Sequence, residues 1–142
     1  MNTLTNPQSN EIKLDILTFD PSESNSGSFD LTLREVAGSR SFQFAIGMFE
    51  TQAIVIVLEK VVPNRPMTHD LFKLLAEQLN FTVEKILLCD YQQPIFYAKI
   101  IGSTGAGGFS LDARPSDAIA IGIRFNAPIY IDESILNKVS FK

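Results

Sequence analysis

The chain of 142 residues contains only one cysteine, Cys89, and one histidine, His69. A lone cysteine excludes an intrachain disulfide and a cysteine-rich zinc site. A lone histidine excludes a metal site with two histidine ligands and weakens any mechanism that relays a proton through histidine. Carboxylates and guanidinium groups, together with this one imidazole, are therefore the main candidates for chemistry.

Long apolar runs and an excess of positive charge are also absent. The longest apolar run, residues 53–58, is far shorter than the roughly 20 residues that span a bilayer, and the polar start of the chain does not have the pattern of a signal peptide. The net charge of −4 and the pI of about 4.9 argue against broad attraction to nucleic acid or anionic membranes. They do not exclude binding of an anion in a local basic cleft. We expect a cytoplasmic protein with no membrane partner.

The composition is that of an ordinary globular protein, with 45% hydrophobic and 20% charged residues. The polar residues 1–10 are predicted to form a disordered tail. Residues 11–142 contain no repeat, low-complexity segment or internal linker. A chain of this length suits one domain, so we expect residues 11–142 to fold as a single unit.

Alternating apolar and polar side chains predict strands at residues 11–19, 29–34, 42–46, 83–91, 95–101, 109–112 and 129–131. Apolar residues at helical spacing predict helices at residues 69–79 and 115–125, and residues 134–137 allow a last helical turn. Residues 47–62 fit both a β-branched strand and a helix. The order of these elements predicts an α+β fold, a mainly antiparallel sheet with about three helices on one face.

The helix predicted at residues 69–79 follows Thr68, a good N-cap, and precedes Asn80, a residue suited to the left-handed conformation that ends helices. Its apolar stripe is predicted to be the buried face and consists of Leu71, Leu74, Leu75 and Leu79. In the helix predicted at residues 115–125, Gly122 would let another backbone come close.

Two polar segments, which we call the polar corners, share an Arg-Pro pair followed by an aspartate. Residues 65–70 read Arg-Pro-Met-Thr-His-Asp and residues 112–117 read Asp-Ala-Arg-Pro-Ser-Asp, each just before or within a helix start. Proline is tolerated in the first helical turn, and an acid there faces the positive end of the helix dipole. We expect the two corners to meet and to build the polar site of the protein.

Each candidate side chain has a chemical and a structural interpretation. The acids Glu50, Glu59, Asp70, Asp112 and Asp117 are oxygen ligands that suit Mg²⁺ or Mn²⁺, and at helix starts they are also common caps. A guanidinium at Arg65 or Arg114 can bind a phosphate or pair with a nearby aspartate. His69 can move a proton or make a structural hydrogen bond.

Aromatic residues alternate along the predicted strands, where they can stack on nucleic-acid bases or fill the core: Phe29, Phe42, Phe44, Phe96 and Tyr97. No lysine or arginine is interleaved with them, and such alternation is typical of a core. The glycine-rich residues 102–108 lack the lysine and helix of a phosphate-binding loop and are interpreted as a hairpin turn.

Taken in order, residues 46–54, the two corners and the Ala-Pro-Ile-Tyr of residues 127–130 form a longer pattern. This pattern resembles the bifunctional nuclease domain family over roughly residues 30–136. The resemblance implies an α+β fold in which residues 47–62 are helical, self-association as a homodimer or higher homo-oligomer, and activity on both DNA and RNA. Many members have Gly-Pro-x-Glu-Ala where this chain has Gly-Met-Phe-Glu-Thr at residues 47–51.

Two functional hypotheses follow. In the first, the protein is a nuclease assisted by Mg²⁺ or Mn²⁺, with the metal held by Glu50, Asp112 and Asp117, catalysis by His69, Asp70, Asp112 and Asp117, and phosphate bound by Arg65 and Arg114. In the second, it is a non-catalytic binding or regulatory module that recognises an anionic ligand or a protein partner.

Overall fold

The structure, a computed structural model, describes residues 10–141. The tail predicted at residues 1–10 lies outside this range except for its last residue. A seven-stranded sheet has the order β3-β2-β1-β7-β4-β5-β6. Its strands are β1 (Glu11–Pro21), β2 (Ser28–Glu35), β3 (Ser41–Gly47), β4 (Thr82–Gln92), β5 (Ile95–Thr104), β6 (Gly107–Ala113) and β7 (Ile129–Asp132). The predicted strands are therefore confirmed.

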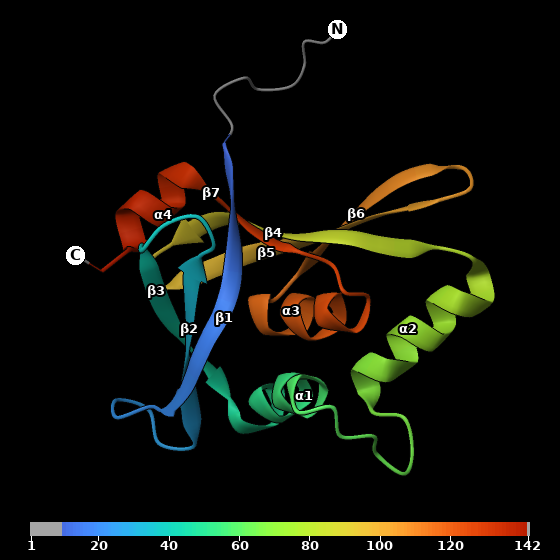
Figure 1. The fold of residues 1–142 in the computed structure, drawn as a ribbon, viewed down its shortest axis with the longest axis horizontal. Coiled ribbons are helices and arrows are strands. Elements are labelled where there is room, and N and C mark those ends of the chain that lie inside the picture. Colours follow the sequence, from blue (N-terminus) through green and yellow to red (C-terminus); the bar gives the residue numbers. More distant parts are fainter. Residues whose placement is uncertain (1–9, 142) are drawn as a thin grey trace, which may run out of the picture.

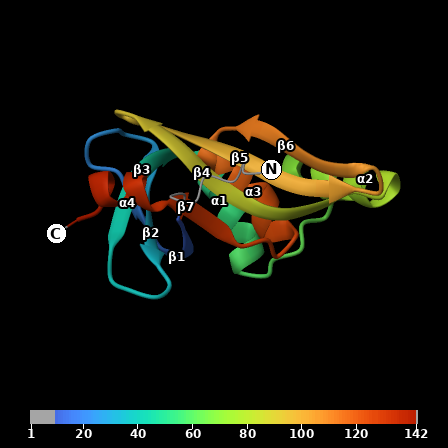
Figure 2. The same cartoon turned by 90° about the horizontal axis from the view of Figure 1, so that it is seen from above.

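The sheet joins two antiparallel meanders, β1–β3 and β4–β6, through the last strand. β7 pairs antiparallel with β1 and parallel with β4, and all other neighbours are antiparallel. Ile129 and Ile131 of β7 are buried, which explains why such a short strand can hold the centre of the sheet. Figure 2 shows the two meanders side by side along the molecule. The prediction of a mainly antiparallel α+β fold is confirmed.

Residues 10–141 contain four helices, whereas about three were predicted: α1 (Met48–Leu58), α2 (Thr68–Leu79), α3 (Pro115–Arg124) and α4 (Glu133–Val139). α1, α3 and α4 contact the sheet, and α2 packs mainly on α3. α4 has seven residues and includes the last helical turn that the sequence allowed at residues 134–137. It is held by Ile135 and Leu136, both buried in the core. α1 and α3 lie below β4 and β5 in Figure 1, whereas α4 lies beside β7 and β3.

The ambiguous segment at residues 47–62 is resolved as α1, as the family resemblance implied. Its β-branched residues favour a strand by propensity, but Ala53 and Ile54 are buried by the contact between α1 and α3. Burial of an apolar face outweighs a propensity difference of less than about 1 kcal/mol per residue. Among residues 10–141, no helix is long and apolar enough to cross a membrane.

The orientation of α2 differs from the prediction. Its four stripe leucines are between 44% and 63% exposed, and the only buried residue of the helix is Ala76. Asn80 does end the helix in the left-handed conformation, with φ of 59°, but Thr68 is the first helical residue and Met67 takes the N-cap position. The predicted buried face is wrong because periodicity identifies an apolar face and not what covers it.

The sheet curls so strongly that β3 and β5, which are not neighbours in it, face each other. The ring centroids of Phe44 on β3 and Phe96 on β5 are 5.1 Å apart, and Phe42 lies 5.4 Å from Phe96. Phe42 is fully buried. The curl therefore creates a core between the two strands and leaves a groove along their edges.

Gly122 of α3 is confirmed as a point of close approach, where the helix meets the side chain of Ile86 on β4. A Cβ at this position would overlap Cγ1 of Ile86, which is itself fully buried. α3 therefore lies as near to the sheet as it does because residue 122 has no side chain.

We expect Gly122→Ala to lower the free energy of unfolding by about 1–3 kcal/mol, because overpacking outweighs the better helix propensity of alanine. Urea denaturation measures this change. The control is Gly105→Ala, because a Cβ at residue 105 would meet nothing within 4 Å. Equal stability of the two variants would show that α3 can move away from the sheet at no cost.

Candidate functional site

The starts of α2 and α3, which contain the two polar corners, meet in space. His69 in the first turn of α2 and Asp117 in the first turn of α3 are joined by a hydrogen bond of 2.9 Å between Nε2 and Oδ1. The two residues are 48 positions apart in the chain. The tertiary structure therefore brings together the two corners that the sequence singled out.

Arg114 extends this contact toward α1. Its Nε donates a hydrogen bond of 2.9 Å to Oδ2 of Asp117, and its Nη2 lies 3.6 Å from Oε2 of Glu50. The hydrogen bond to Asp117 raises the pKa of Arg114. Because 65% of its side-chain surface remains exposed, the guanidinium keeps N–H groups that can bind an anion.

Asp117 is the centre of this network. Partial burial alone would raise the pKa of its carboxyl group, but the hydrogen bonds with Arg114 and His69 have the larger combined effect and lower that pKa. The carboxylate is therefore ionised at neutral pH and fixes both neighbours. We call the chain Glu50–Arg114–Asp117–His69 the polar network.

The position of the Glu50 side chain depends on Gly47, the residue before α1. A Cβ at Gly47, the N-cap residue, would overlap Oε1 of Glu50. The absence of a side chain at Gly47 thus leaves space for the carboxylate, which also faces the positive end of the α1 dipole.

A second ion pair lies nearby and involves a residue that the sequence analysis missed. Arg124 Nε donates to Asp70 Oδ1 at 2.6 Å, and its Nη1 donates to the backbone oxygens of Ala53 and Ala120 at 2.9 and 2.7 Å. The Arg124 side chain is only 4% exposed. A single cation in the last turn, directly after the apolar residues 118–123, was the signal that could have identified it.

Asp70 makes the structural contacts that the sequence analysis weighed as its alternative role. Its Oδ2 accepts a hydrogen bond of 2.8 Å from the backbone N–H of Met67, the N-cap residue of α2. Burial would raise the pKa of Asp70, but the N–H of Met67 and the guanidinium of Arg124 together lower it. Asp70 therefore caps α2 and ties it to α3.

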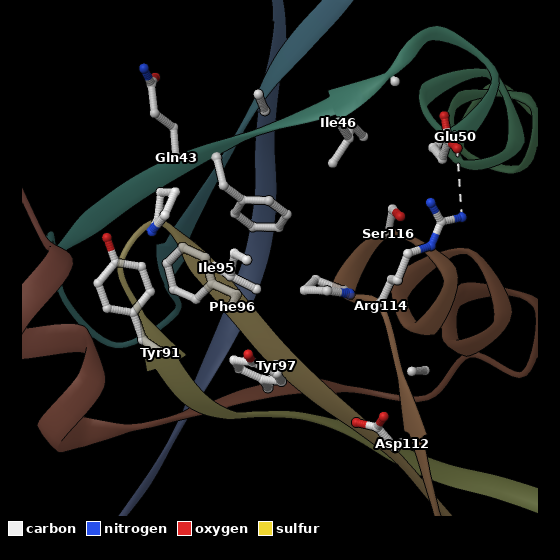
Figure 3. Close-up of a pocket in the computed structure, with 16 residues that line it drawn as sticks. Gln43, Ile46, Glu50, Tyr91, Ile95, Phe96, Tyr97, Asp112, Arg114 and Ser116 are labelled. Atoms are coloured by element: carbon white, nitrogen blue, oxygen red, sulfur yellow. Dashed lines mark ion pairs between the residues drawn. The ribbon is translucent and has the colours of Figure 1, made fainter.

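A cavity of about 700 Å³ opens beside the polar network, and we call it the aromatic groove (Figure 3). It lies between β3 and the start of α1 on one side, and β5, the end of β6 and the start of α3 on the other. Its aromatic lining is Phe44, Tyr91, Phe96 and Tyr97, and its charged lining is Glu50, Asp112 and Arg114. The volume is in the range of small-molecule sites.

The predicted site residues divide into three groups. Glu50, Asp112 and Arg114 line the aromatic groove, whereas the groove does not include Asp117 and His69, which contact it only through Arg114. Asp112 is exposed on β6, opposite Lys99 of β5. The remaining candidates, Asp70, Arg65 and Glu59, do not line the groove. Arg65 and Glu59 are exposed, whereas Asp70 pairs with Arg124.

The predicted Mg²⁺ or Mn²⁺ site remains a prediction. Among residues 10–141, no three side chains of histidine, cysteine, aspartate or glutamate gather closely enough to hold a metal ion. Mg²⁺, however, often uses one or two carboxylates and completes its shell with water and substrate phosphates. The groove contains two carboxylates, Glu50 and Asp112, but Figure 3 shows them well separated, with Arg114 between them, so one cation could use only one of the two. Asp117 is occupied by Arg114 and His69.

The fold and the groove define a single-domain α+β protein with carboxylates and a guanidinium at one end of an aromatic cavity. The family model for the bifunctional nuclease domain matches residues 31–142, most of the chain. The chain belongs to the bifunctional nuclease domain family.

Two relatives, both uncharacterized proteins of Mycobacterium tuberculosis from different strains, are each 38% identical to this chain over 106 residues. The aligned region covers 75% of this chain and 63% of each relative. The chain thus spans less than two thirds of the length of these relatives.

We expect Asp70→Asn to lower the free energy of unfolding at pH 7 by about 3 kcal/mol, because it leaves the buried guanidinium of Arg124 without its anion. Since the folded-state pKa of Asp70 is lowered, its contribution is present above the ordinary pKa of about 4 and is lost as the pH falls through the folded-state value. The stability difference between wild type and variant should therefore shrink in acid.

Urea denaturation across a pH series measures this difference. The control is Asp112→Asn, which changes an exposed carboxylate and should alter stability by no more than about 0.5 kcal/mol. A difference for Asp70→Asn that stays constant down to pH of about 2 would contradict the role of the ionised carboxylate.

Proposed function

We propose that the protein is a nuclease that hydrolyses phosphodiester bonds of DNA and RNA in the aromatic groove. The observation that carries the proposal is Arg114, a mostly exposed guanidinium that lines the groove and is fixed by carboxylates on two sides. Membership of the bifunctional nuclease domain family supports the choice of nucleic acid as substrate.

In this proposal Arg114 binds a phosphate oxygen and stabilises the charge that develops on the phosphate during hydrolysis. Asp117 and His69 act as positioning residues, since they reach the groove only through Arg114. Asp70 has a structural role through Met67 and Arg124. The earlier expectation that Arg65 binds phosphate is not part of the proposal, because Arg65 lies outside the groove.

Glu50 is the carboxylate best placed to activate water, because it lines the groove within 3.6 Å of Arg114. The water oxygen forms a bond to phosphorus, its proton passes to Glu50, and the leaving sugar oxygen takes its electron pair and a proton from solvent. A divalent cation that binds in the groove beside Glu50, and takes its other ligands from water and the substrate phosphate, would supply charge stabilisation at the phosphate.

We expect Glu50→Gln to lower the rate of cleavage of a labelled oligonucleotide by about 100-fold or more, because the amide cannot accept the proton. The matched control is Glu59→Gln, at the other end of α1 and outside the groove, which should cleave like wild type. Equal trace cleavage by wild type and both variants would point to a contaminating nuclease.

The same assay with EDTA, and then with added Mg²⁺ or Mn²⁺, tests the metal. Thermal denaturation with each ion gives a second readout, since a ligand at 100 times its Kd adds about 2.7 kcal/mol of stability. Unchanged cleavage in EDTA and no thermal shift would remove the metal from the proposal. Binding of nucleotides without any cleavage would instead favour the non-catalytic binding module.

We also propose that the protein forms homodimers or larger homo-oligomers through the exposed leucine face of α2. Leu71, Leu75 and Leu79 recur every four residues and form one apolar ridge, and Leu74 lies beside it. Two such ridges can pack against each other in antiparallel helices. The apolar segment at residues 53–58 is a less suitable interface, because Ala53 and Ile54 are buried.

We expect Leu75→Glu to dissociate the oligomer, because it places a charge in the centre of an apolar contact. Light scattering should then detect a species of 15.7 kDa where the wild type is at least twice as heavy. The control is Leu17→Glu, a similarly exposed leucine on β1, which should leave the mass unchanged. A wild-type protein of 15.7 kDa at all concentrations would contradict this proposal.

A further inference from the structure

The aromatic half of the groove is not used by the proposed hydrolysis. Tyr91 and Phe96 lie with ring centroids 4.5 Å apart and planes tilted by 45°, and Phe44 lies 5.1 Å beyond Phe96. Phe96 is 7% exposed, so its ring is fixed by the core, whereas Tyr91, Phe44 and Tyr97 are only partly buried. Figure 3 shows Tyr91, Phe96 and Tyr97 on the β4–β5 side of the cavity.

Strand pairing explains why this part of the sheet is open. β6 ends its pairing at Ala113 opposite Ala98, so the first residues of β5, Ile95–Tyr97, extend beyond it. β3 is the strand at the other edge of the sheet. The groove therefore lies between two strand segments that have no neighbour on the side facing it, and a flat group can enter beside the rings.

The charge of the groove argues against a long phosphate track. Arg114 is its only lysine or arginine within the described residues, and Glu50 and Asp112 add two negative charges. The whole chain has a net charge of −4. Binding of nucleic acid here must therefore draw its free energy mainly from stacking of bases, with one phosphate near Arg114.

We propose that the aromatic groove binds one unpaired nucleobase against Tyr91 and Phe96, with a phosphate farther along the same strand at Arg114, which lies at the other side of the groove (Figure 3). The preferred ligands are then single-stranded DNA and RNA with little sequence preference, since every base offers a flat face. Duplexes bind poorly because a base must first leave its stack. The link to cleavage rests on the proposed nuclease function, whereas the binding itself does not.

The absence of tryptophan from the chain provides a direct probe. Tyr91→Trp introduces a single indole into the groove, and a stacked base should quench its fluorescence. We titrate it, without divalent metal, with a 12-nucleotide single strand, the blunt duplex of the same sequence and an abasic strand of equal length. The single strand should bind at least tenfold more tightly than the other two.

The same affinities are measured with wild-type protein by anisotropy of a labelled strand, so that the result does not depend on the indole. The logarithm of the binding constant should fall with the logarithm of salt concentration with a slope of about −0.7, the value for one phosphate contact with a single strand. A slope several times steeper would show that the phosphate backbone dominates and would overturn the proposal.

Tyr91→Leu removes the aromatic ring and keeps an apolar side chain, and it should weaken single-strand binding about tenfold or more. Tyr91→Phe keeps the ring and should bind like wild type. The control is Tyr130→Leu, a partly buried tyrosine of β7 outside the groove, which should also bind like wild type. Equal binding by Tyr91→Leu and wild type would overturn the proposal.

Cleavage, scored separately on gels with Mg²⁺ or Mn²⁺, distinguishes this inference from the nuclease proposal. Selective single-strand binding without cleavage supports nucleobase binding in the aromatic groove and contradicts the proposed nuclease function. Cleavage of single strand and duplex at equal rates, unchanged in Tyr91→Leu, supports the nuclease proposal and overturns nucleobase binding in the aromatic groove.

Discussion

One buried guanidinium holds together the helices on which the candidate site depends. Arg124 bonds to a backbone oxygen of α1, to Asp70 of α2 and to a backbone oxygen of its own helix α3. Its Nε and Nη1 make these bonds, whereas its Nη2 is buried and has no hydrogen-bond partner among the described residues. A buried charge is costly unless it is paired and hydrogen-bonded. This requirement fixes the three helices relative to one another, and with them the corner where His69 meets Asp117.

The polar network depends on that arrangement because its members come from three helix starts. Glu50 belongs to α1, His69 to α2, and Arg114 and Asp117 to the N-cap and first turn of α3. Each acid faces the positive end of a helix dipole and also receives a hydrogen bond or a cation. The same contacts that stabilise the helix starts therefore orient Arg114 toward the groove.

The groove itself is a consequence of sheet curvature. The curl that packs Phe42 and Phe44 against Phe96 closes a core, but β6 ends before the start of β5 is covered. Phe42 and Phe96 are buried in that core, whereas Phe44, Tyr91 and Tyr97 are only partly buried. The aromatic residues near this edge therefore divide between the core and the lining of the groove.

The sequence by itself determined the strands, α2 and α3, the left-handed end at Asn80 and the two proline-led corners, because these depend on local periodicity and local backbone chemistry. From the residues alone, α1 could have been a strand or a helix, and the helical turn allowed at residues 134–137 had no defined extent; the tertiary structure decided both. It left the leucine face of α2 exposed. It also decided that Arg114 lies at the groove and Arg65 does not. These outcomes depend on which surfaces meet, and a local pattern carries no information about its partner.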